Sequence, residues 1–202
     1  MRQSAGGLEH YAVIWEHTVV NAPRGRAEDI RCGGTTKGGV LVVDNCDGLG
    51  RLPTGQELWR AFSAASGPDR DAAGFGSMLL AAAAGLVDAH RRFAAAHLDT
   101  GDRELLNACK DLESHMTTID RHARDVLSAR PVHSAAVTHP ENAGSIFSHL
   151  AWLYTRSFSA QGYPLGGLRC PERSQLAAGI RKYGALVVEL EAGRRRLPVM
   201  DG

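Results

Sequence analysis

The longest regular pattern of apolar residues in the chain lies between Asp102 and Arg130. Its apolar positions are separated alternately by four and three residues, and they are Leu105, Cys109, Leu112, Met116, Ile119, Ala123 and Val126. This spacing is typical of one face of an α-helix. Acidic residues near its start and arginines near its end suit the helix dipole, and Pro131 stops it. We therefore predict a helix over 102–130, about 40 Å long.

A second apolar stripe precedes it and predicts a partner helix over 69–98. Its positions are Leu79, Ala83, Leu86, His90, Phe93 and His97. Gly74 and Gly76 weaken the beginning of this helix, so a start near Ser77 is the alternative. The connection at 99–102 is short and contains a glycine, which makes the two helices antiparallel neighbours. The rest of the chain is expected to pack around this hairpin.

Three further helices are predicted from apolar periodicity and from the residues at their ends. Thr54 and Glu57 form a capping box for a helix through residue 65, with Leu58, Phe62 and Trp59 buried. Thr138 and Glu141 form the same pattern for a helix that ends near residue 162, with Ile146, Leu150, Leu153 and Ser157 on its apolar face. A last helix over 174–192 has Leu176, Ile180, Tyr183, Val187 and Leu190 in register, and Gly193 ends it.

The remaining segments are less regular. Residues 8–20 fit either a helix or a strand, and we favour a helix. Residues 21–53 are rich in glycine and contain one short β-branched run, so we expect an irregular or weakly β insertion. Residues 194–202 are expected to be a frayed tail. The predicted fold is a single all-α domain over 1–202, an antiparallel bundle of five or six helices.

The composition of the chain argues against several classes of function. The net charge of +1 argues against a broad nucleic-acid interface. No apolar run reaches the length of a membrane span, and the first residues lack the core of a signal peptide. The four cysteines are scattered without a C-x-x-C motif, which favours a reduced, cytoplasmic setting. A basic patch and a solvated face are the two interpretations of Arg91, Arg92, Arg121, Arg124 and the run at 194–196, and the interspersed acids favour the solvated face.

Histidine spacing is the most unusual feature of the sequence. Three pairs stand seven residues apart, His10 and His17, His90 and His97, and His115 and His122. Seven residues is nearly two helical turns, so each pair lies on one helix face. In a functional interpretation, His90, His97, His115 and His122 line the hairpin interior as acid–base groups or ligands. In the simpler interpretation, which we prefer, they are core histidines whose hydrogen bonds are satisfied, or half-exposed residues next to the apolar stripe.

Metal-binding signatures are sparse. Glu-x-x-His and His-x-x-x-His do not occur, so di-iron, hemerythrin-like and His-Glu-x-x-His zinc sites lack their local motifs. Asp111 and His115, four residues apart, form an acid–histidine pair with ligand-like spacing on one face. A single pair is slight support for a metal site, and the sequence identifies no cofactor.

Two functions follow from these observations. The first, which we prefer, is an accessory or protein-interaction role with a partner chain or as a homo-oligomer, because amphipathic helices abound and no complete catalytic motif occurs. The alternative is a small helical-bundle enzyme, in a specialised biosynthetic pathway, that uses inward-facing histidines. A small-molecule ligand is compatible with either function.

Overall fold

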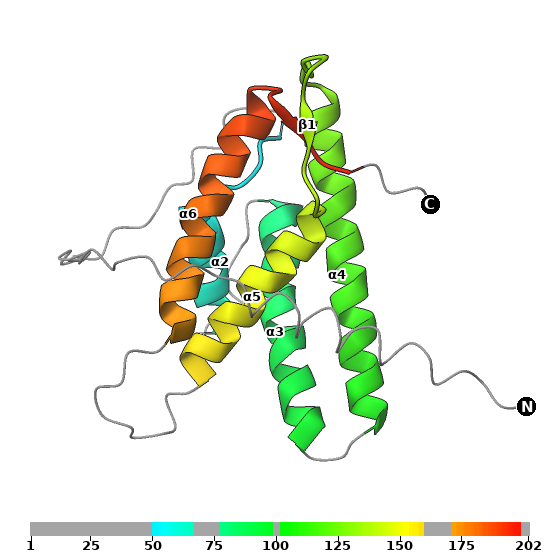
Figure 1. Cartoon of the computed structure of the whole chain (residues 1–202). Helices are drawn as coiled ribbons and strands as arrows, with labels where there is room; N and C mark the ends of the chain where they lie inside the picture. Colours follow the sequence, from blue (N-terminus) through cyan, green and yellow to red (C-terminus); the bar gives the residue numbers. More distant parts are fainter. Residues whose placement is uncertain (1–49, 67–76, 99–101, 160–170, 199–202) are drawn as a thin grey trace, which may run out of the picture. The chain divides into compact units, whose positions relative to one another are not determined.

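The computed structural model describes residues 50–66, 77–98, 102–159 and 171–198. These ranges contain five helices and two short strands: α2 (Gly55–Ala64), α3 (Met78–Leu98), α4 (Asp102–Ser128), β1 (Val137–Thr138), α5 (Ala143–Ser159), α6 (Pro171–Glu191) and β2 (Arg195–Arg196). The predicted all-α class is confirmed (Figure 1). Within these ranges, no helix is long and apolar enough to cross a bilayer.

Helices α3 and α4 form the predicted hairpin and lie side by side (Figure 1). The apolar stripe of α4 faces the core as expected, since Ile119 and Ala123 are fully buried and Leu112 and Met116 are partly buried against the core cluster. Helix α3 begins at Met78, as in the alternative with a start near Ser77. Its burial is wider than the predicted stripe because it contacts α2, α4 and α5, and the additional buried positions are Ala82, Ala84, Val87, Ala89 and Ala96.

The predicted capping box opens α2. The Thr54 hydroxyl accepts a hydrogen bond from the Glu57 N–H at 3.2 Å, and the Glu57 carboxylate accepts one from the Thr54 N–H at 2.7 Å. Leu58 and Phe62 are fully buried. The prediction that Trp59 is buried is wrong, because its side chain is 38% exposed. Trp59 lies at the edge of the core, in edge-to-face contact with Tyr154 at 5.6 Å between ring centroids.

The predicted start of α5 is also wrong. Helix α5 begins at Ala143, and its N-cap is Asn142, whose side-chain oxygen accepts a hydrogen bond from the Ser145 N–H at 2.7 Å. Thr138 instead belongs to β1, where its hydroxyl accepts a hydrogen bond from Arg196 Nε at 2.8 Å. The Thr-x-x-Glu pattern therefore precedes the helix, because pairing with a distant strand holds Thr138 in an extended conformation.

The end of α6 follows the prediction, whereas the segment after it does not. Gly193 has φ of 69°, and the N–H groups of Gly193 and Arg194 return to the carbonyls of Leu190 and Glu189. This is the Schellman pattern that ends many helices. Residues 195–196 then form β2, which pairs in parallel with β1 in the register Val137 with Arg195. The expected frayed tail is therefore wrong for 194–198, because backbone pairing and the packing of Leu197 against the core hold it.

Several predictions fall on residues that the structure does not describe. They are the helix over 8–20, the insertion at 21–53 up to residue 49, the start of the predicted helix at 69–76, the connection at 99–101, the helix end near residue 162 and the tail at 199–202. The last residues of the insertion are irregular and packed, since Leu52 is buried and the Pro53 carbonyl accepts a hydrogen bond from the Tyr183 hydroxyl at 2.8 Å. The single-domain organisation stays a prediction.

Candidate functional site

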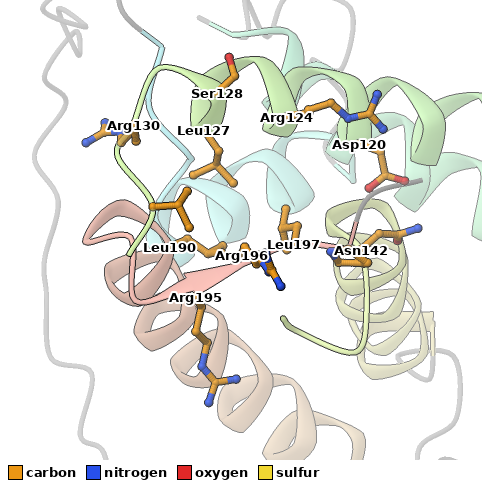
Figure 2. Close-up of a pocket in the computed structure, with 12 residues that line it drawn as sticks. Asp120, Arg124, Leu127, Ser128, Arg130, Asn142, Leu190, Arg195, Arg196 and Leu197 are labelled. Atoms are coloured by element: carbon orange, nitrogen blue, oxygen red, sulfur yellow. The ribbon is translucent and has the colours of Figure 1, made fainter. Parts of the chain in front are cut away.

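A cavity of about 220 Å³ lies between the second half of α4, the start of α5, the end of α6 and β2. Figure 2 shows its walls, with residues of α4 on one side, Asn142 at the start of α5, and Leu190 with β2 on the other side. Four arginines line it, Arg124, Arg130, Arg195 and Arg196. We call this cavity the arginine pocket.

The pocket carries an excess of positive charge. Guanidinium groups stay protonated at any physiological pH, and Asp120 is the acidic residue among the lining side chains. Arg130 lies 3.7 Å from the carboxylate of Glu191, and Arg196 is oriented by its bond to Thr138. Each guanidinium group has further N–H donors, and their planar arrangement matches the oxygen atoms of a carboxylate or phosphate group. Figure 2 shows the guanidinium groups of Arg130 and Arg195 directed outward from the cavity, so their charge acts from its rim.

Asp120 and Asn142 form the polar wall at the first turn of α5. The Asp120 carboxylate accepts a hydrogen bond from the Gly144 N–H at 2.8 Å, which satisfies an N-terminal donor of α5. Burial raises the pKa of Asp120, and the hydrogen bonds from α5 and the charge of Arg124 oppose that rise. The residue thus joins α4 to α5 and places one negative charge among the arginines.

The floor of the pocket is apolar. Leu190 is 4% exposed, while Leu127 and Leu197 pack against the core in part. Val132, at the rim, is 53% exposed. An occupant could thus bury apolar atoms next to its charged group.

His90 and His97 both lie on α3. The His90 ring is buried and its Nε2 lies 3.0 Å from both the carbonyl and the hydroxyl oxygen of Ser148 on α5. Because a carbonyl can only accept, we assign the proton to Nε2. Burial lowers the pKa of His90 to about 4. The ring is therefore neutral near pH 7 and joins α3 to α5. The side chain of His97 lies outside the described residues.

His115 occupies a different interface, where its ring lies against the backbone of Gly85 between α4 and α3. Burial lowers the pKa of His115, and Arg92 acts in the same direction while Asp111 opposes it. His122 is half-buried further along α4. His90 and His115 thus contact different neighbours, Ser148 and Gly85.

In the predicted ligand pair of Asp111 and His115, the carboxylate of Asp111 is bound by Arg92. Asp111 accepts a hydrogen bond from Arg92 Nη2 at 2.7 Å, and Arg92 also donates to Asp88 at 3.2 Å. This ion-pair network links α3 to α4. Among the residues that the structure describes, no group of three or more His, Cys, Asp or Glu side chains is placed to hold a metal ion.

Sequence reasoning did not bring the pocket residues together. The sequence predicts a solvated face for Arg124 and the run at 194–196, and a frayed tail from residue 194. Asn142, followed by the apolar periodicity of α5, was a signal for the correct N-cap. Ser148, the partner of His90, carries no signal in the sequence alone.

Comparisons with protein-family models, with curated proteins and with solved structures give no match to this chain.

Proposed function

We propose that this protein is an accessory protein that docks an acidic segment of a partner protein into the arginine pocket. The observation that carries the proposal is the set of four arginines around an apolar floor. Arginine is enriched at the centres of protein interfaces because it combines bidentate hydrogen bonds with stacking and apolar contact.

The surroundings of the pocket support a macromolecular partner. Val132 at its rim and Val137 in the neighbouring β1 are 53% and 63% exposed, so apolar surface continues beyond the cavity. An acidic segment with alternating apolar side chains would place carboxylates on the arginines and apolar groups on the leucines. A reducing, cytoplasmic setting belongs to this proposal, because the four cysteines form no paired motif.

The experiment measures fluorescence anisotropy with a labelled octapeptide of alternating Glu and Leu, and with a Lys–Leu peptide for comparison. We expect the acidic peptide to bind and its affinity to fall as salt is added. Arg124→Gln combined with Arg196→Gln should weaken binding by roughly a hundredfold, about tenfold for each guanidinium.

The matched control is Arg121→Gln combined with Arg181→Gln. Both arginines are exposed, one on α4 and one on α6, and neither lines the pocket. This pair removes the same charge, so it should retain most of the affinity. Equal losses in the two double variants, or equal binding of the Lys–Leu peptide, would contradict docking in the pocket. Native mass measurement tests whether a second copy of the chain is the occupant instead. A dimer that dissociates when Arg124→Gln and Arg196→Gln are combined would mean that a second copy docks in the pocket.

A further inference from the structure

We propose that Asp120 tunes the anion selectivity of the arginine pocket by lowering its preference for a doubly charged phosphate group over a singly charged carboxylate. This inference rests on the proposed docking function and specifies the chemistry of the group that docks. It makes Asp120 a specificity-determining residue as well as a cap of α5.

The first turn of α5 holds the carboxylate of Asp120 in place. One oxygen accepts the hydrogen bond from the Gly144 N–H at 2.8 Å. A Cβ atom on Gly144 would lie 3.0 Å from the other oxygen and 2.6 Å from the Met116 carbonyl oxygen. The first turn of α5 therefore packs directly on this part of α4, and the Asp120 side chain cannot leave the pocket wall without breaking its hydrogen bond.

The arginines without such a residue would favour phosphate. Guanidinium groups bind phosphate and carboxylate in the same bidentate geometry, and phosphate offers more acceptors and more charge. The carboxylate of Asp120 lies in the same pocket wall as Arg124, whose charge it partly offsets. Repulsion from Asp120 acts once on a carboxylate and up to twice on a phosphate dianion. The fixed negative charge thus penalises phosphate more.

Asp120→Asn tests this role because asparagine keeps a side-chain oxygen for the Gly144 N–H and removes the charge. The matched control is Asp125→Asn, an exposed position on α4 that does not line the pocket. The probes are the labelled Glu–Leu octapeptide and the same peptide with one glutamate replaced by phosphoserine. Thermal unfolding of each variant reports whether the cap of α5 is intact.

We expect the wild-type protein to bind the phosphoserine peptide with at most a small advantage over the glutamate peptide, because Asp120 offsets part of the attraction to the arginines. Asp120→Asn should bind the glutamate peptide about tenfold more tightly and the phosphoserine peptide about a hundredfold more tightly, so that the advantage of the phosphoserine peptide grows about tenfold. Asp125→Asn should change both affinities by less than about threefold.

Two results would overturn the inference. One is an equal change in both affinities on Asp120→Asn, and the other is weaker binding of both peptides with a lower unfolding temperature, which would assign Asp120 a capping role alone. In either case the docking function stands if Arg124→Gln combined with Arg196→Gln still weakens binding of the glutamate peptide by roughly a hundredfold. If neither peptide binds the wild-type protein or Asp120→Asn, both proposals fail.

Discussion

At the scale of single residues, His90 shows how a buried imidazole can serve the fold. Its ring is 6% exposed and donates a hydrogen bond to Ser148 across the interface of α3 and α5. Protonation would place a charge in this apolar interface and add a second N–H group to it. The folded state therefore holds His90 in its neutral form.

This arrangement predicts a dependence of stability on pH. The pKa of His90 falls from 6.5 to about 4 on folding, so the unfolded chain binds more protons between these values. The stabilisation is complete above pH 6.5 and is lost as the pH falls through 4, by about 3 kcal/mol in total.

Urea unfolding of the wild-type protein and of His90→Gln at neutral pH and near pH 4 measures this contribution. The difference in free energy of unfolding between the two proteins should shrink by about 3 kcal/mol on acidification. An NMR titration of the His90 ring gives its pKa directly. A difference that stays constant with pH, together with a ring that titrates near 6.5, would contradict the prediction.

At the scale of elements, the packing of α5 on α4 depends on a glycine. A Cβ on Gly144 would approach the Met116 carbonyl oxygen to 2.6 Å, and backbone atoms cannot yield without moving a helix. Gly184 on α6 provides the opposite case, since a Cβ there would meet nothing within 4 Å. The two positions are both helical glycines, and they differ in the space around them.

We expect Gly144→Ala to lower the free energy of unfolding by about 2–3 kcal/mol, because α5 must shift away from α4. Gly184→Ala should raise it by about 0.5–1 kcal/mol, because alanine favours a helix and restricts the unfolded chain. Urea unfolding of both variants measures the changes. If the two substitutions change the free energy of unfolding in the same direction, the close approach of α5 to α4 is not what restricts position 144 to glycine.

The elements also show which parts of the fold a sequence can specify. The seam of α4 was predictable because its period depends on residues within one helix. The start of α5 was not, because Thr138 and Asn142 are both acceptable N-caps and the choice between them depends on β2, more than fifty residues away. Trp59 likewise followed the period of α2, but the edge of the core is set by how α2 meets α5.

At the scale of the molecule, the candidate site belongs to no single segment. The arginine pocket takes residues from α4, the segment before α5, the end of α6 and β2. Sequence spacing could place the histidines on helix faces, but it could not place Arg196 and Asn142 in the lining of one pocket. That juxtaposition depends on β2 turning back after Gly193 to pair with β1. The backbone pairing of two-residue strands therefore determines whether the pocket exists.

Removal of residues 195–202 should test this dependence. It takes away β2 and Leu197 but keeps the Arg194 N–H that closes α6. The His139 N–H, which donates to the Arg196 carbonyl at 2.8 Å, should then exchange with solvent at least about tenfold faster, and the free energy of unfolding should fall by about 1–2 kcal/mol. Removal of residues 199–202 alone is the control and should leave both quantities unchanged. Hydrogen exchange monitored by NMR distinguishes the outcomes, since unchanged protection of His139 in the longer truncation would mean that β2 does not hold this face of the pocket.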